Sequence, residues 1–310
     1  MPLVKRILVA GDLNVDLLLS GCSGPPIPGQ ETLARGFTMT LGGAAAICAA
    51  GLGRLGRKVK FLGVVGQDLW GTFCLQELAR SGVDDSGVLK DAAQATGVTV
   101  SVSSSEDRAL VTYPGAIACL TEAAFGPGVF EGFDHFHVSS FFLLSGLASS
   151  LASLLARARA EGLTTSLDPG FDPRERWTDI LSALGHCDLF LPNAVELRAI
   201  TGLREPLKAL QDLANGTTRT VVKLGSAGAV TLESGVLLEM PAYPVDAQDT
   251  TGAGDSFDAG FLHAWLEGFP LRTCLAWGAA AGAIATRGAG GSSSQGDAAE
   301  IERLMRSSPR

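Results

Sequence analysis

The chain has 310 residues, of which 46% are hydrophobic and 18% are charged, and its formal net charge at pH 7 is −8. This composition provides a large apolar core and argues against intrinsic disorder. The excess of acidic residues is unlike the basic composition expected of a nucleic-acid-binding protein. No apolar run approaches the length of a membrane span. The six cysteines form no C-x-x-C pair, and the start MPLVKRILVAGD has no signal-peptide layout. We therefore expect a cytoplasmic protein with no nucleic-acid or membrane partner.

Short apolar runs alternate with longer helical patterns along the chain. Runs that are apolar throughout are typical of strands buried on both faces of a parallel sheet. The predicted strands lie at residues 7–10, 59–65, 136–138, 164–167, 188–191 and 220–224. The predicted helices lie at residues 43–56, 70–81, 146–161, 194–201, 205–214, 255–267 and 271–286. This alternation predicts an α/β fold with a doubly wound, mostly parallel sheet.

Two segments, approximately residues 16–40 and 96–117, do not fit the alternation. The second contains VTVSVSSSEDRALVTYPG, which alternates with period two around a polar turn and predicts a β-hairpin. The first could supply companion strands. We interpret both as a small β-sheet lid inserted in one domain of residues 1–310, with ordinary surface excursions as the alternative.

The stretch GLGRLG, residues 51–56, matches the dinucleotide-binding pattern G-x-G-x-x-G. That pattern must follow a strand and open a helix, whereas here the helix already opens near residues 42–43. The P-loop pattern also fails, because Arg57 and Lys58 stand where Lys and Ser or Thr are required. We interpret these glycines as positions of close helix packing, with Gly56 ending the helix.

A better candidate for a phosphate site is DTTGAGDSFDAGF, residues 249–261. Small residues after Thr251 form an open turn that leads into a helix beginning near Asp255. Backbone N–H groups at a helix N-terminus can form an anion hole, and the helix dipole adds to it. The Asp255 carboxylate could then accept the proton of an attacking hydroxyl during phosphoryl transfer. A glycine-rich turn with an acidic first-turn residue is the structural alternative, and the spacing alone leaves both open.

The same stretch resembles the C-terminal signature of ribokinase-like (pfkB family) carbohydrate kinases. Other motifs of that family follow in family order: GDLNVDLLL, LGGAAAICAAGLGRLG, GVVGQDLWG, GVD at residues 82–84, LPNAVEL and VVKLGSAGA. The resemblance covers essentially the whole chain. Several separated motifs in one order are a stronger signal than any one of them.

The resemblance implies a catalytic centre and an acceptor site. Asp255 would be the catalytic base, and Gly252, Ala253 and Gly254 would form the anion hole with it. The acceptor sugar would be bound by a second set of residues near the N-terminus. That set is Asn14, Asp16, Gly42 and Gly43, with Ile47 in the same motif and Asp255 at the reacting hydroxyl.

The resemblance also implies ATP and Mg²⁺ as cofactors, and a monovalent-cation site that often holds potassium. Asn193 and Glu196 match an N-x-x-E motif linked to magnesium and phosphate, with Glu196 acting through water. The nucleotide site would include Lys223, Gly225, Gly228, Ala283 and Thr286. Asp249 and Thr251 match the monovalent-cation loop. In this family the lid closes over the acceptor and often forms the contact between the two subunits of a dimer. The resemblance therefore also implies a homodimer through the lid.

Several positions depart from the ribokinase pattern. Ile47 and Ile117 stand where Asn is frequent, Gly170 and Asp172 replace parts of a D-P-N-x-R pattern, and no glutamate lies near residue 143. An apolar side chain cannot replace a hydrogen bond to a sugar hydroxyl. The acceptor is therefore left open between another sugar, a sugar acid and a nucleoside.

The four histidines lack metal-ligand spacing. We expect His135 and His137, on one predicted strand, to point one outward and one inward.

Overall, the sequence predicts an ATP-dependent sugar kinase that phosphorylates a hydroxyl, with a primary hydroxyl favoured. The alternatives are a nucleoside kinase of the same fold and a non-catalytic sugar or nucleotide sensor.

Overall fold

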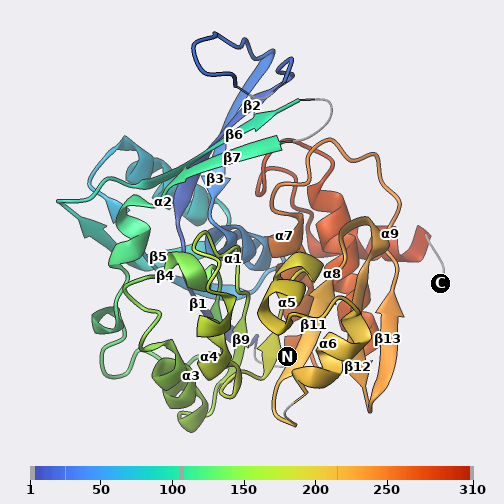
Figure 1. Ribbon diagram of the computed structural model, residues 1–310. Coiled ribbons are helices and arrows are strands. Elements are labelled where there is room, and N and C mark those ends of the chain that lie inside the picture. Colours follow the sequence, from blue (N-terminus) through green and yellow to red (C-terminus); the bar gives the residue numbers. More distant parts are fainter. Residues whose placement is uncertain (1–3, 25, 105–107, 215, 308–310) are drawn as a thin grey trace.

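A large sheet forms the centre of the molecule in the computed structural model, which describes residues 4–24, 26–104, 108–214 and 216–307 (Figure 1). Within these residues its strand order is β13-β12-β11-β10-β9-β8-β1-β4-β5. Neighbouring strands are parallel, except that β12 is antiparallel to both β11 and β13. The strand bounds are β1 (Arg6–Ala10), β4 (Lys58–Gly66), β5 (Val83–Asp91), β8 (His135–Val138), β9 (Thr164–Leu167), β10 (Leu189–Phe190), β11 (Arg219–Lys223), β12 (Ala229–Glu233) and β13 (Val236–Met240). The predicted mostly parallel α/β sheet is confirmed, and β5, β12 and β13 are the strands that the sequence pattern did not reveal.

Helices cover both faces of this sheet because successive residues of a buried strand point to opposite sides. On β1, Ile7 and Val9 join a core cluster with residues of α1, α2, α7, α8 and α9, whereas Leu8 and Ala10 join a second cluster with α3 and α4. The helix bounds are α1 (Ala44–Arg54), α2 (Leu69–Arg80), α3 (Leu151–Ala160), α4 (Leu181–Leu184), α5 (Ala194–Thr201), α6 (Pro206–Asp212), α7 (Ala253–Leu266), α8 (Leu271–Ala285) and α9 (Ala298–Ser307). None of these described helices combines the length and the apolar character needed to cross a bilayer.

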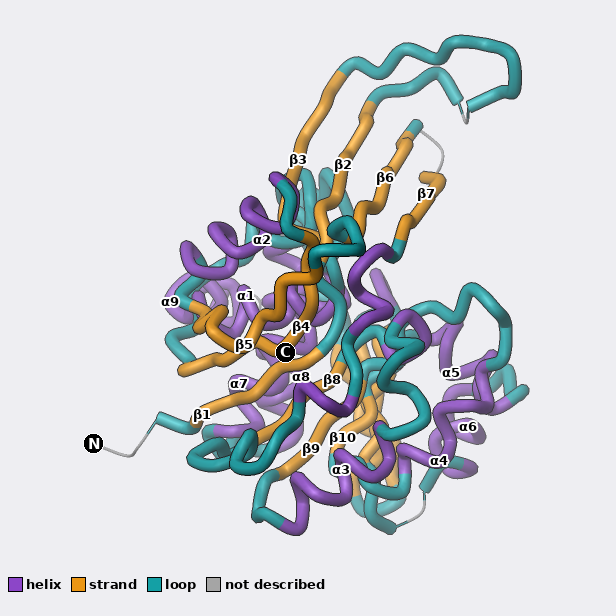
Figure 2. Tube along the Cα trace, turned by 90° about the vertical axis from the view of Figure 1, so that its left-hand side faces the viewer, coloured by secondary structure: helices purple, strands orange, loops and turns teal. Residues whose placement is uncertain are grey.

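A smaller sheet projects from the main body, as Figure 2 shows. Its strands are β2 (Asn14–Ser20), β3 (Gly36–Gly42), β6 (Gly97–Ser103) and β7 (Arg108–Tyr113), in the order β3-β2-β6-β7. Both segments that we singled out therefore contribute strands to one small sheet, although residues 25 and 105–107 lie outside the described part of the chain. The sheet itself is confirmed, and its action as a lid stays a prediction.

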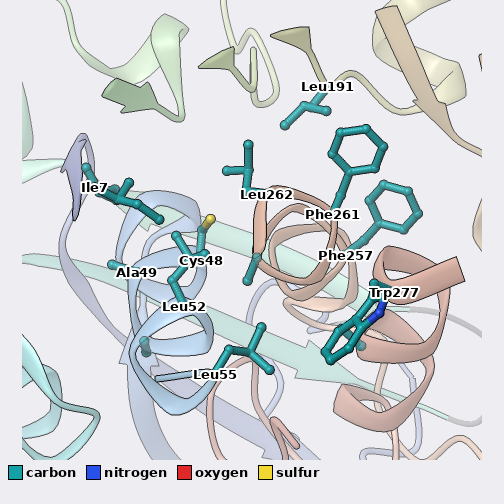
Figure 3. Close-up of a cluster of buried hydrophobic side chains, with 14 of the residues drawn as sticks. Ile7, Cys48, Ala49, Leu52, Leu55, Leu191, Phe257, Phe261, Leu262 and Trp277 are labelled. Atoms are coloured by element: carbon teal, nitrogen blue, oxygen red, sulfur yellow. The ribbon is translucent and has the colours of Figure 1, made fainter. Parts of the chain in front are cut away.

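The glycines of GLGRLG serve close packing. A β-carbon on Gly51 would lie 2.8 Å from the β-carbon of Ala259 on α7, and one on Gly53 would lie 2.1 Å from the Ser81 carbonyl oxygen. Gly56 follows the end of α1 with a φ of 79°, a conformation that favours glycine. Figure 3 shows how closely α1 and α7 approach, with Leu52 and Leu262 between them. The structural interpretation of this motif is confirmed.

The expectation for the two strand histidines was wrong, because residues two apart on a strand share a face. His135 and His137 are both fully buried, and Ser166 Oγ lies 2.7 Å from a ring nitrogen of each. Burial lowers the pKa of His135 to about 3 and that of His137 to about 4, so both rings are neutral at physiological pH. Their second ring nitrogens bond to Thr164 and Ser139, which completes a buried polar column along β8 and β9.

Candidate active site

The start of α7 combines a glycine turn with an acidic first turn. Gly252 precedes the helix with a φ of 71°, and no described side chain caps the helix start. Ala253 and Gly254 are its first residues, so the helix begins two residues before the predicted start near Asp255. A β-carbon on Gly252 would lie 2.3 Å from Gly291 Cα, which leaves no room for a larger residue. The predicted anion-hole residues therefore form one continuous turn with backbone N–H groups at its open end.

Asp255 belongs to this first turn and is partly buried. Burial and, after it, the negative charge of Asp168 raise the pKa of its carboxyl group to about 8, although the Lys223 charge opposes both effects. A carboxylic acid with a pKa near the working pH suits a group that must take up a proton during a reaction. The position and the chemistry of Asp255 fit the role expected from the sequence.

Lys223 lies behind this turn at the end of β11. Its Nζ atom donates to Asp168 Oδ2 at 2.6 Å and to Asp258 Oδ2 at 2.9 Å. The sequence motifs assigned no role to Asp168 or Asp258. The signal was available, because Asp258 follows Asp255 by three positions and residues three apart are neighbours on a helix.

The acceptor residues predicted from the N-terminal motifs lie together at the base of the small sheet. Asn14 Nδ2 donates to Asp16 Oδ1 at 2.8 Å and to Thr99 Oγ1 at 3.2 Å, and both Asn14 and Asp16 are buried. A β-carbon on Gly42 would lie 2.0 Å from Asp16 Oδ1. The first glycine of the pair is therefore required so that the Asp16 carboxylate can lie against the backbone.

Asp12 is a residue of this region to which the sequence assigned no role. Its carboxylate accepts hydrogen bonds from Ala44 N at 3.0 Å and Ala45 N at 2.9 Å, directly after Gly43. Burial raises the pKa of Asp12, while these amide donors lower it. The first amides of α1 are thus already bonded within the protein.

The N-x-x-E motif forms a capping box at the start of α5. Asn193 Oδ1 accepts the N–H groups of Val195 and Glu196, and Glu196 Oε2 accepts the N–H of Asn193 at 2.8 Å. Burial and, after it, the Asp168 charge raise the pKa of Glu196 to about 7, against the opposing effect of Lys223. Within the described residues no three His, Cys, Asp or Glu side chains are grouped to hold a metal ion. The capping box thus fixes the Glu196 side chain at the start of α5, next to Asn193.

The loop predicted to hold a monovalent cation, with Asp249 and Thr251, lies against the loop after α8. Asp249 Oδ1 accepts the Thr251 N–H and hydroxyl groups at 2.9 and 2.7 Å, and Asp249 Oδ2 accepts the Gly290 N–H at 2.9 Å. The Thr286 carbonyl oxygen accepts two further N–H groups, from Gln248 and Asp249. One carboxylate thus joins the turn before α7 to the loop after α8.

The remaining nucleotide-site candidates lie around the same edge. Gly225 and Gly228 follow Lys223 with φ values of 59° and 100°, and a β-carbon on Gly228 would lie 1.9 Å from the Met240 carbonyl oxygen. Ala283 lies near the end of α8, next to Gly282, whose β-carbon would meet the Ala253 carbonyl oxygen at 2.9 Å. Gly228 thus has a structural reason to be glycine, and α8 reaches the start of α7.

The positions that depart from the ribokinase pattern are mostly buried. Ile47 is 3% exposed and Ile117 is 1% exposed. A β-carbon on Gly291 would lie 2.5 Å from Ile47 Cδ1, so Ile47 packs under the loop that also contacts Gly252. Asp172 accepts the backbone N–H groups of Arg174 and Arg176 and thereby shapes its own loop. These residues support the site by packing and turn formation.

Comparisons with known proteins bear on the family and the fold of the chain. The model of the pfkB family carbohydrate kinases matches residues 4–297. The chain is 32% identical over 272 residues to 2-dehydro-3-deoxygluconokinase of Bacillus subtilis (strain 168), covering 82% of this chain and 83% of that one. It is 28% identical over 300 residues to ribokinase of Haemophilus influenzae, covering 94% and 95% of the two chains. A structure of a protein provisionally identified as ribokinase II from E. coli, with ATP and Mg²⁺, aligns over 99% of this chain and all of that chain with a TM-score of 0.85 and 24% identity.

The chain belongs to the pfkB family of carbohydrate kinases. The ribokinase-like fold expected from the resemblance is confirmed. The expected activity, phosphoryl transfer to a hydroxyl group of a sugar, is the activity of this family.

Proposed function

We propose that the chain transfers the γ-phosphoryl group of ATP, bound with Mg²⁺, to a hydroxyl group of an uncharged sugar, and a primary hydroxyl is the favoured acceptor. The observation that carries this proposal is the start of α7. There, N–H groups that no described side chain caps and the Asp255 carboxyl group belong to the same helical turn. One turn can thus supply both the anion hole and the base.

In this mechanism the acceptor hydroxyl gives its proton to the Asp255 carboxylate as its oxygen attacks the γ-phosphorus. The bond from that phosphorus to the bridging oxygen of ATP breaks, and ADP leaves. The N–H groups of residues 252–255 stabilise the charge on the transferred group. Asn14, Asp16, Gly42 and Gly43 orient the acceptor, and Ile47 packs behind them. Asp255 has to be ionised before it can act, so its raised pKa links activity to pH.

Magnesium bound with ATP would offset the charge of the phosphates. Glu196 would hold it through water, since the Asn193 side-chain oxygen already accepts two N–H groups. The nucleotide would lie along the loop that carries Gly225 and Gly228 and near Ala283 and Thr286, at the end of α8.

The groups around Asn14 support an uncharged acceptor. Its side-chain amide donates to the Asp16 carboxylate, to the Val15 carbonyl oxygen and to the Thr99 hydroxyl, which in turn bonds to Thr112. Hydroxyl, amide and carboxylate groups can bond to sugar hydroxyls, whereas the Asp12 and Asp16 carboxylates would repel an acid or a phosphate. A nucleoside is the second uncharged acceptor class.

ADP release from Mg-ATP should be measured with neutral sugars, sugar acids, sugar phosphates and nucleosides, beside Asp255→Asn. We expect turnover with a neutral sugar and its loss in the variant. Turnover with nucleosides alone would make the protein a nucleoside kinase, and turnover with acids or phosphates would contradict the uncharged acceptor. Binding of ATP or sugar without any turnover would favour a sensor.

A monovalent cation, potassium by expectation, would bind where Asp249 joins residues 249–251 to residues 286–290. The support is that these two segments are already held together by that carboxylate and by the Thr286 carbonyl oxygen. Replacing potassium by a large organic cation should then lower kcat. Equal rates in both salts would contradict a cation site.

A homodimer through the small sheet is supported by one apolar face of that sheet. Phe37 and Met39 on β3 share this face with Val111 and Tyr113 on β7, and they are 66%, 38%, 70% and 52% exposed. Exposed apolar patches of this kind usually mark contact surfaces. Sedimentation should give a dimer for the wild type and a monomer for Val111→Lys. A monomeric wild type would contradict the proposal.

A cytoplasmic location is supported by the cysteines, since the six described thiols form no disulfide and five of them are buried. Fractionation of cells that express the protein at its natural level would test this location. Recovery in a secreted fraction would contradict it.

A further inference from the structure

Lys223 joins three separate elements of the fold. Its Nζ atom is 2.6 Å from Asp168 Oδ2, just after β9, and 2.9 and 3.2 Å from the two carboxylate oxygens of Asp258 on α7. All three residues are buried, with exposed fractions of 8%, 3% and 0%. A single ammonium group thus connects β9, β11 and α7 inside the protein.

A buried cluster of this kind depends on all of its members. The ion pair of Lys208 and Glu205 on the surface, with side chains 63% and 67% exposed, contributes little to stability. A buried pair that loses one partner instead leaves a charge that neither water nor protein compensates. Burial and the Asp168 charge raise the pKa of Asp258, which favours its neutral form, whereas the Lys223 ammonium group keeps the pKa of Asp168 low. The position of α7 against the sheet is therefore tied to this cluster.

The ammonium group lies directly behind the candidate anion hole. A β-carbon added to Gly254 would be 3.6 Å from Lys223 Nζ and 3.8 Å from its Cδ and Cε atoms. Asp258 lies one turn further along α7 than Gly254 and Asp255. The cluster thus contacts the helical turn that has to be positioned for phosphoryl transfer.

We propose that Lys223 is a positioning residue, which forms with Asp168 and Asp258 an ionic brace that holds the first turn of α7 against the carboxyl ends of β9 and β11. This inference rests on the proposed function, because it takes that turn to carry the anion hole and the base. It differs from the expectation that Lys223 lines the nucleotide site. In the brace, Lys223 acts on the reaction only through the geometry and charge of α7.

The experiment compares Lys223→Met with the wild type and with Lys208→Met, a matched surface control. We expect kcat of Lys223→Met to fall about 100-fold, the effect of misplacing reacting groups by about 1 Å. The dissociation constant of Mg-ADP should stay at the wild-type value. Lys223→Arg, which keeps the charge, should recover part of the rate, and Lys208→Met should equal the wild type.

The pH profile separates this role from a simple contribution to folding. Asp168, Asp12 and Glu196 raise the pKa of Asp255, and Lys223 lowers it. The acid limb of kcat/KM should therefore move to higher pH in Lys223→Met. A weakened Mg-ADP complex with unchanged kcat would instead mean that the ammonium group contacts the nucleotide, and unchanged kinetics would also overturn the brace.

Amide hydrogen exchange at residues 252–256 supplies a readout that does not depend on activity. We expect faster exchange in Lys223→Met, and wild-type exchange would contradict the brace. If Lys223→Met does not fold, Lys223→Met/Asp168→Asn removes both charges, and a wild-type kcat in that variant would overturn the proposal. If the wild type phosphorylates no acceptor, the proposed function fails, while the exchange measurement still decides on the brace.

Discussion

Two helices of this molecule begin in the same way but in different surroundings. Helix α1 follows Gly43, with a φ of 94°, and α7 follows Gly252, with a φ of 71°. Neither glycine has a side chain that could cap its helix, so both helices present backbone N–H groups at their first turn. The two helices pack directly against each other in the core (Figure 3).

The difference lies in the carboxylate at each helix start. At α1, Asp12 comes from the turn after β1 and already accepts the N–H groups of Ala44 and Ala45. At α7, the acidic group is Asp255, which belongs to the helix itself, and no described side chain caps the start. The first N–H groups of a helix that follows a glycine can thus bind an external anion only where no carboxylate of the protein already accepts them.

The strongest test of this contrast is Asp255→Asn. We expect kcat to fall about 1,000-fold, because an amide cannot take the proton of the acceptor hydroxyl and general bases contribute rate factors of this order. The melting temperature should not fall. The raised pKa of Asp255 means that the folded protein loses stability as pH rises from about 4 to about 8, and the amide lacks this loss. If Asp255→Asn kept more than a tenth of the wild-type kcat, its rate would be roughly a hundredfold higher than expected for loss of the base. That result would exclude Asp255 from the role of catalytic base.

Gly252→Ala tests the backbone of the same turn. The new methyl group would lie 2.3 Å from Gly291 Cα on a backbone with positive φ, so the turn has to move. We expect a loss of about 100-fold in kcat and about 1–3 kcal/mol in the free energy of unfolding. Gly268→Ala is the matched control, since Gly268 has a φ of 78° and no neighbour within 4 Å. Equal kcat losses in the two variants would contradict a special role of the α7 start.

The pH dependence of kcat/KM gives a test without any mutation. The pKa of Asp255 is raised to about 8, so the fraction of ionised base grows about tenfold per pH unit well below that value. We expect kcat/KM to rise with pH and to level off above about pH 8. A profile that is flat between pH 6 and 8 would mean that Asp255 is ionised throughout and that its burial has no kinetic consequence.

The sequence predicted the sheet well because β1, β4, β10 and β11 are almost entirely buried and read as short, largely apolar runs. All six predicted strands exist, and the seven predicted helices correspond to α1, α2, α3, α5, α6, α7 and α8. Strands β5, β12 and β13 escaped prediction because polar residues, such as Thr231 and Glu233 on β12 and Glu239 on β13, interrupt their apolar runs. The helix predicted from residue 146 starts only at Leu151, after a stretch of turns.

Without the family resemblance, the candidate site was predictable only where a single motif carried it. Asp255 and residues 252–254 lie on one short stretch, so their proximity follows from the sequence. The contacts of Asp12 with α1 and of Lys223 with Asp168 and Asp258 join residues that are from 32 to 55 positions apart. Such contacts depend on which strands are neighbours in the sheet, and no local pattern contains that information.

Asp12→Ala should change kcat least of these variants, and it tests whether the start of α1 differs in function from the start of α7. It removes the acceptor of two buried N–H groups, so we expect a loss of about 1–2 kcal/mol in the free energy of unfolding and a change in kcat of only a few-fold. Asp12→Asn keeps one acceptor oxygen and should lose less. Thermal unfolding and steady-state kinetics check both variants. A kcat loss in Asp12→Ala as large as that of Gly252→Ala would mean that both helix starts act directly on the transferred group, because a cap that serves only the fold can be weakened without changing the reaction.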